Sequence, residues 1–214
     1  QVAPATEGPV ATELPYARIY VDTGVFHLDT PFDYEVPEKF SEVVKTGVRV
    51  QVPFGNREVE GLVIERVGAP SITSGIKSIT KVLSHHQVAT PNSLELIAQA
   101  AQRWATNPWD VIRSAIPPRV AAVDKTFVPT ALRSTRSNNQ SDICFRAFEP
   151  HISAHAQVAS IAFDSIRKGS VLIVAPDERD IIAICALLEA SSAPVVRIDS
   201  GLSRSERYAN FLQS

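Results

Sequence analysis

Residues 47–67 read GVRVQVPFGNREVEGLVIERV and decide the fold of the N-terminal part of the chain. Residues 48–52 alternate valine with arginine and glutamine, the period-two pattern of a half-buried strand. The turn-forming sequence PFGN at residues 53–56 interrupts this pattern. Residues 59–67 are again rich in β-branched side chains. The stretch therefore predicts a β-hairpin.

The flanking sequence predicts more strands and then helices. Residues 17–21 and 79–83 are short apolar runs typical of strands. Thr90 and Pro91 form a helix start, followed by apolar residues at helical spacing, and residues 110–115 predict a shorter helix. We expect residues 16–118 to form an α+β domain, a small β-barrel-like fold with one or two helices.

A different pattern begins at residue 143. The predicted elements alternate between helix and strand: helix 154–168, strand 171–175, helix 178–190, strand 195–198 and helix 203–212. This alternation is typical of a parallel α/β sheet, which normally contains more than two strands. We therefore expect residues 143–214 to be the beginning of an α/β lobe. Residues 1–15 are predicted to be a flexible leader and residues 119–142 a linker.

Composition limits the classes of function. The 214 residues are 44% hydrophobic and 21% charged, and their formal net charge is -2, so bulk charge does not favour binding to nucleic acid or anionic lipid. The two cysteines, Cys144 and Cys185, have no metal-ligand spacing and fit a reducing cytoplasm. We predict no membrane partner, because no apolar run is long enough for a membrane helix. The lack of any methionine, even at position 1, suggests a trimmed chain or a fragment.

Several ordered motifs carry a family resemblance. They are TPFDYEVP at residues 30–37, GVRVQVPFG at 47–55, EGLV at 60–63, IKSITKVL at 76–83 and DVIRSAIPP at 110–118. In this order and spacing they resemble the N-terminal DNA-binding domain of the PriA family of bacterial replication-restart helicases, also called primosomal protein N′. The resemblance covers roughly residues 17–118. It implies a domain that captures the 3′ end of a nascent strand at a stalled replication fork.

By the same resemblance, the 3′-end pocket falls on Phe32, Asp33, Gly55 and Lys77. A carboxylate can accept a hydrogen bond from a terminal 3′-hydroxyl and repel a 3′-phosphate. A lysine can offset a phosphate charge, an aromatic ring can contact a base, and a glycine lets a nucleotide approach the backbone. Taken without the resemblance, the same residues would be a core aromatic, a turn or cap residue, a hairpin glycine and a solvated charge.

The later motifs VLIVAPD (171–177) and SGLSRSER (200–207) resemble parts of the first RecA-like helicase lobe of this family. An active lobe needs a glycine-rich phosphate loop ending in Gly-Lys. Residues 145–155, FRAFEPHISAH, hold no glycine at that place. This departure resembles the helicase-inactive members described for actinobacteria. We expect no cofactor in this chain; ATP, magnesium and zinc are expected only for full-length active members.

The preferred hypothesis is non-catalytic binding of branched DNA and stalled forks in replication restart and primosome assembly. The family also implies single-stranded-DNA-binding protein and other primosome proteins as partners. The alternatives are a truncated ATP-dependent 3′-to-5′ DNA helicase and a protein scaffold that has lost DNA binding. No catalytic residue is predicted.

Six other side chains are weaker candidates. His151 and His155 have the i, i+4 spacing of metal ligands, but no third ligand is apparent and we predict no metal site. We expect His85 and His86 to lie in a polar turn. Trp104 and Trp109 are expected to pack between helix and barrel.

Overall fold

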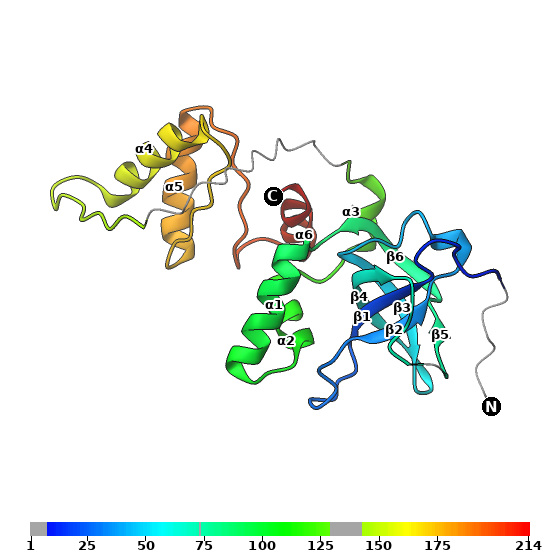
Figure 1. The fold of residues 1–214 in the computed structure, drawn as a ribbon. Coiled ribbons are helices and arrows are strands. Elements are labelled where there is room, and N and C mark those ends of the chain that lie inside the picture. The colour runs from blue at the N-terminus through cyan, green and yellow to red at the C-terminus, as the bar shows by residue number, and fades with distance from the viewer. Residues whose placement is uncertain (1–7, 73, 129–142) are drawn as a thin grey trace. The chain divides into compact units, whose positions relative to one another are not determined.

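The computed structural model describes residues 8–72, 74–128 and 143–214. The chain divides into two compact units, residues 1–126 and residues 127–214 (Figure 1). No helix within the described ranges is long and apolar enough to cross a membrane.

The first unit is an α+β fold around a curled, half-barrel sheet (Figure 1). Its six strands are β1 (Tyr16–Val21), β2 (Phe32–Glu35), β3 (Val48–Phe54), β4 (Arg57–Val67), β5 (Lys77–Ser78) and β6 (Lys81–Gln87). Their order in the sheet is β5-β2-β1-β4-β3-β6. All neighbours are antiparallel except β2 and β5, which are parallel.

The predicted hairpin is confirmed as β3 and β4. The two strands pair antiparallel from Arg49 opposite Leu62 to Phe54 opposite Arg57, so only two residues form the turn. Gly55 in this turn has φ +60°, a left-handed conformation that glycine adopts without steric cost. The alternating valines of β3 point into the core. The side chains between them lie on the opposite face, where Arg49 is buried and donates to the Pro117 carbonyl at 2.7 Å.

The core of the first unit lies on the inner face of this sheet. Its fully buried members come from several strands and from the loops that follow them: Ala17, Ile19, Val36, Val44, Val48, Val50, Val52, Val63 and Ile79. The sheet therefore buries one continuous apolar face, as expected for a half-closed antiparallel barrel.

Three α-helices follow the strands: α1 (Pro91–Trp104), α2 (Pro108–Ala115) and α3 (Ala121–Thr126). The predicted start of α1 is confirmed: the Thr90 side chain accepts a hydrogen bond from the Ser93 amide at 3.2 Å, and Ser93 reciprocates as a capping box. The Asn107 side chain caps α2 by accepting from the Trp109 amide at 2.9 Å. A single-turn 3-10 helix, η1 (Glu38–Phe40), follows β2.

Some local predictions for the first unit are wrong. The expected strand 79–83 is displaced, since β5 ends at Ser78 and β6 begins at Lys81. His85 and His86 lie within β6 rather than in a turn, because β6 extends to pair with β3 up to Val48.

Segments expected to be flexible make specific contacts. Of the expected linker 119–142, residues 129–142 lie outside the described residues, and the described part contains α3, whose Asp124 carboxylate accepts a hydrogen bond from Ser84 of β6 at 3.2 Å. Of the expected leader, residues 1–7 lie outside the described residues. The rest is held to the barrel, where the Ala11 amide donates to the Val36 carbonyl at 2.9 Å.

The described residues of the second unit form three helices: α4 (Ala154–Ile166), α5 (Glu178–Ala190) and α6 (Arg204–Gln213). They confirm the three helices predicted there to within two residues. The strands predicted at 171–175 and 195–198 are wrong for the described residues, because neither segment forms a ladder of backbone hydrogen bonds. The RecA-like lobe stays a prediction.

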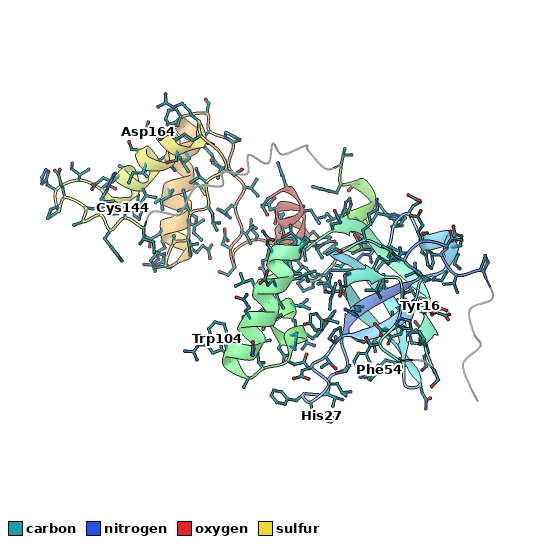
Figure 2. All side chains as sticks on the ribbon, in the orientation of Figure 1. Tyr16, His27, Phe54, Trp104, Cys144 and Asp164 are labelled. Atoms are coloured by element: carbon teal, nitrogen blue, oxygen red, sulfur yellow. The ribbon has the colours of Figure 1, made fainter. Side chains whose placement is uncertain are left out.

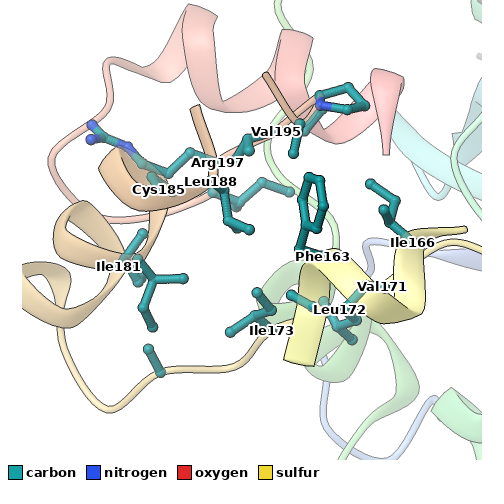
Figure 3. A pocket seen from close by; sticks show the side chains of 17 residues that line it. Phe163, Ile166, Val171, Leu172, Ile173, Ile181, Cys185, Leu188, Val195 and Arg197 are labelled. Carbon is teal, nitrogen blue, oxygen red and sulfur yellow. The ribbon is translucent and has the colours of Figure 1, made fainter. Parts of the chain in front are cut away.

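These two extended segments still pack on the helices. Ile173 and Val195 contact the small core of α4 and α5. An apolar cavity of about 170 Å³ lies between the segments, with Phe163 and Leu188 on its wall (Figure 3). The Leu172 and Val174 side chains are 87% and 85% exposed.

Candidate nucleic-acid interface

Three of the four predicted site residues meet at the turn of the β3–β4 hairpin. The Lys77 Nζ donates a hydrogen bond to the Gly55 carbonyl at 3.2 Å. The Phe32 ring packs edge-to-face on the Phe54 ring, with centroids 5.4 Å apart and planes at 72°. Phe54 immediately precedes Gly55 and lies at this end of the half-barrel (Figure 2). An aromatic pair, an ammonium group and an exposed turn therefore adjoin.

Strand pairing explains this arrangement. β5 pairs parallel with β2, so Lys77 lies opposite Tyr34. The Tyr34 hydroxyl donates to the Pro53 carbonyl at 3.2 Å, which ties β2 to the hairpin turn across the barrel. Burial, with a smaller contribution from the Glu58 carboxylate, raises the pKa of Tyr34 above its usual value of 10.0. The hydroxyl therefore stays a hydrogen-bond donor at neutral pH.

Gly55 leaves open space at this turn. No atom lies within 4 Å of the position that a Cβ would occupy, apart from the excluded chain neighbours. Its left-handed backbone also disfavours any larger residue. A flat ligand can therefore approach the Gly55 backbone next to the Lys77 ammonium group.

Asp33 lies on the other face of the sheet. Successive side chains of a strand point to opposite faces, and Phe32 packs against the inner core. Asp33 is paired in register with Arg18 of β1, which projects outward because its neighbours Ala17 and Ile19 are buried. The structure thus gathers Phe32, Gly55 and Lys77 on one side and places Asp33 on the other.

The Asp33 carboxylate is held from two directions. Its Oδ2 accepts a hydrogen bond from the Ser71 amide at 2.5 Å, and its Oδ1 lies 3.7 Å from Arg18 Nε. The Asp33 side chain is only 4% exposed. Ser71 belongs to the loop between β4 and β5, so this loop covers Asp33 on the outer face.

The edge of β2 connects the two faces. β5 begins at Lys77, opposite Tyr34, and the described residues supply no strand partner for Phe32 and Asp33 on that side. A ligand at this edge would lie against the aromatic side, and it would reach the carboxylate only by displacing the Ser71 amide. Asp33 therefore lies on the opposite face from Phe32, Gly55 and Lys77, and only the edge of β2 separates it from them.

Sequence reasoning missed three residues of this region: Arg18, Glu65 and Ser71. Arg18 donates to the Glu65 carboxylate at 2.7 Å, across the β1–β4 pair. No local pattern marks these residues, because their proximity to Asp33 arises only from strand register and from a loop that folds back. Phe54, in contrast, lies in the PFG motif at residues 53–55, so the local sequence does mark it.

The tryptophan prediction is half right. Trp109 belongs to α2 and is buried, as expected. Trp104 is 73% exposed at the end of α1, where Ala105 adopts a left-handed conformation that ends the helix. Asn107 clamps the β1–β2 loop: its amide donates to the Val25, Phe26 and Leu28 carbonyls.

The two histidines of the second unit pair with separate carboxylates. His151 Nε2 lies 3.1 Å from Glu149 Oε2, and His155 Nε2 lies 2.7 Å from Asp180 Oδ1. Across the described ranges, no group of three or more His, Cys, Asp or Glu side chains is placed to hold a metal ion.

Comparison with known proteins supports this reading of the first unit. The family described as 3'DNA-binding domain (3'BD) matches residues 18–117. The probable replication restart protein PriA of Mycobacterium tuberculosis is 29% identical over 213 aligned residues, covering 87% of this chain and 32% of that protein. The replication restart protein PriA of Bacillus subtilis is 27% identical over 108 residues, covering 50% of this chain and 13% of that protein. The chain thus spans about a third of the length of its mycobacterial relative.

Residues 18–117, which include all six strands of the sheet except the first two residues of β1, are thus similar to 3' DNA-binding domains. The chain is similar to replication restart proteins PriA, in agreement with the resemblance of its ordered motifs.

Proposed function

We propose that this chain binds the 3′-terminal nucleotide of a nascent strand at a branched DNA fork, as a non-catalytic step of replication restart. The observation that carries the proposal is the contact of Lys77 with Gly55 beside the Phe32–Phe54 pair, inside a domain that matches the 3' DNA-binding family. This cluster provides a cation and an apolar surface next to an open backbone. These are the groups that a nucleotide needs and that a chain without bulk positive charge must supply locally.

Each group has a role that follows from its chemistry. The terminal base or sugar lies against the exposed Gly55 turn and the aromatic pair. The Lys77 ammonium group offsets the charge of a backbone phosphate. Its hydrogen bond to the Gly55 carbonyl holds it beside the turn. This contact is independent of base sequence, since every nucleotide carries the same phosphate and a flat base.

Asp33 supplies the end specificity in this proposal. A 3′-hydroxyl that crosses the β2 edge replaces the Ser71 amide as donor to the carboxylate, so Asp33 exchanges one hydrogen bond for another. A 3′-phosphate has no comparable donor and carries negative charge. The carboxylate therefore repels it.

No nucleotide hydrolysis is needed for this function. Residues 145–155 contain no glycine with which to build a phosphate loop, and Glu149 adds negative charge there. We expect binding to persist without ATP and in the presence of a chelator. Sustained ATP hydrolysis by the pure chain, stimulated by single-stranded DNA, would instead support the helicase alternative.

The test is fluorescence anisotropy at low, fixed salt with two labelled forks that differ only in a 3′-hydroxyl or a 3′-phosphate on the leading strand. We expect tighter binding to the hydroxyl and a loss of about tenfold in Asp33→Asn, the size of one hydrogen bond to a charged group. Glu42→Gln is the matched control, because Glu42 is an exposed carboxylate outside the cluster. Equal binding of both forks by the unaltered chain would refute end recognition.

Lys77 is tested by salt dependence. Lys77→Gln should weaken binding to both forks equally and reduce the slope of log affinity against log salt by roughly one phosphate contact. Lys45→Gln, at an exposed lysine elsewhere on the first unit, is the control. An unchanged slope in Lys77→Gln would remove this residue from the interface.

We extend the proposal to protein partners of the restart assembly, single-stranded-DNA-binding protein among them, on the family resemblance alone. A pull-down of that protein by the chain, with and without a fork, tests this extension.

A further inference from the structure

Three charged side chains form a row across the outer face of the sheet. Strand register places Asp33 of β2 opposite Arg18 of β1, and Arg18 opposite Glu65 of β4. Side chains directly opposite one another in antiparallel strands lie close enough to interact. We call Asp33, Arg18 and Glu65 the charge row.

The guanidinium of Arg18 is shared unequally within the charge row. Arg18 Nη1 donates to Glu65 Oε1 at 2.7 Å, whereas Arg18 Nε lies 3.7 Å from Asp33 Oδ1, beyond hydrogen-bond distance. The described residues give Asp33 Oδ1 no other donor, since Ser71 donates to Oδ2. Glu65 therefore keeps Arg18 engaged, so that Asp33 Oδ1 lacks a hydrogen-bond donor among the described residues although the side chain is buried.

The charge row also keeps a net negative charge. It contains two carboxylates and one guanidinium, so Asp33 is not neutralised by its neighbour. Without Glu65, Arg18 and Asp33 would form a neutral pair. A 3′-phosphate would then meet a guanidinium with spare donors, a group that binds phosphate well.

We propose that Glu65 is a specificity-determining residue that acts through Arg18: it preserves the charge of Asp33 and so excludes 3′-phosphate ends. Glu65 touches no nucleotide in this arrangement and is a positioning residue. This inference rests on the proposed function, because it assigns the discrimination at that same site.

The test is the ratio of affinities of the full chain for the 3′-hydroxyl and 3′-phosphate forks, measured at low salt. Glu65→Gln should lower this ratio by about threefold to tenfold, mainly through tighter binding of the phosphate fork. Arg18→Gln should raise the ratio, because it leaves two uncompensated carboxylates. The double variant Arg18→Gln/Glu65→Gln should return the ratio near its original value, because Asp33 alone again carries the charge.

This order of ratios separates electrostatics from folding. Loss of structure would lower binding to both forks in each variant and would give no rescue in the double variant. Glu42→Gln, which makes the same change in net charge away from the charge row, should leave the ratio unchanged.

Two failures are distinguishable. If the unaltered chain binds both forks equally, the proposed function fails and the inference fails with it. If the unaltered chain discriminates and Asp33→Asn abolishes this, an unchanged ratio in Glu65→Gln overturns the role of Glu65 alone.

Discussion

The two units of the chain use similar apolar segments in different ways. In the first unit, the VRVQV segment of β3 lies in a sheet, and Val48, Val50 and Val52 are at most 1% exposed. In the second unit, the VLIVA segment at 171–175 has no strand partner among the described residues. Its Leu172 and Val174 side chains face solvent. An apolar run becomes a core strand only when other strands satisfy its backbone.

The comparison also separates two kinds of packing. The first unit closes a half-barrel around a continuous set of buried side chains. The second unit rests on two helices and keeps an apolar cavity of about 170 Å³ between its extended segments (Figure 3). We expect the stability of the chain to be concentrated in the first unit.

Hydrogen exchange should show the largest contrast. Amides in the centre of β3 and β4 should exchange only through global unfolding, at a cost of about 5 kcal/mol or more, whereas amides of residues 171–175 should exchange with little protection. Peptide-resolved mass spectrometry measures both segments in one experiment. Slow exchange at 171–175 would mean that these amides have backbone partners, and the contrast would disappear.

Gly47→Ala should be the most damaging single change in the first unit. Gly47 has φ +81°, and an added Cβ would overlap the backbone oxygen of Ala89, which cannot move aside as a side chain could. We expect a loss of about 4 kcal/mol in the free energy of unfolding from left-handed strain and overlap together. Urea denaturation measures it. Gly55→Ala, with open space around its Cβ, is the control and should cost about 1 kcal/mol.

Matched core truncations test where the stability resides. Ile19→Ala, at a fully buried position of β1, should cost about 3 kcal/mol, while Ile173→Ala in the second unit should cost less than about 1 kcal/mol. Both tryptophans, Trp104 and Trp109, belong to the first unit, so their fluorescence follows its unfolding alone. A shift of that transition by Ile173→Ala would show that the two units unfold together.

The smallest effect concerns Tyr34 and pH. Because the pKa of Tyr34 is raised on folding, the folded state holds its proton more tightly than the unfolded state does. Its contribution to stability is complete below the unfolded value of 10.0 and falls as the pH rises above it. Tyr34→Phe should cost about 1 kcal/mol at neutral pH, through loss of the bond to Pro53, and should show a shallower alkaline decline.

Urea unfolding at about pH 8 and about pH 11 measures the change for Tyr34. The pKa of Tyr20 is also raised, by burial and by the Asp29 carboxylate, so part of the alkaline decline should remain in Tyr34→Phe. Identical declines in the two proteins would contradict the role given to Tyr34.

Much of the first unit could be predicted from local sequence. The alternation at 48–52 and the PFGN turn determine the hairpin, and Thr90 with Pro91 determines the start of α1. These signals work because each depends on residues close in the chain. The helix α3 was missed, since it lies in a segment with little apolar periodicity and is held by Asp124 against β6.

The candidate site divides in the same way. The motifs TPFDYEVP and PFG drew attention to Phe32, Asp33, Gly55 and Lys77 as residues with suitable chemistry. That Lys77 meets Gly55 depends on the pairing of β5 with β2, two segments about forty residues apart. That Asp33 faces Arg18 rather than Phe54 depends on strand register, in which a shift of one residue would exchange the two faces.

The sequence by itself determined the hairpin, the helix starts and the chemical groups available for binding a nucleotide, because short-range periodicity and turn chemistry specify them. Only the tertiary structure decided which of these groups share a face, which loop covers Asp33, and that Arg18 stands between two carboxylates. The physical reason is that cross-strand neighbours are chosen by the burial of the whole apolar face of the sheet, which no single segment encodes.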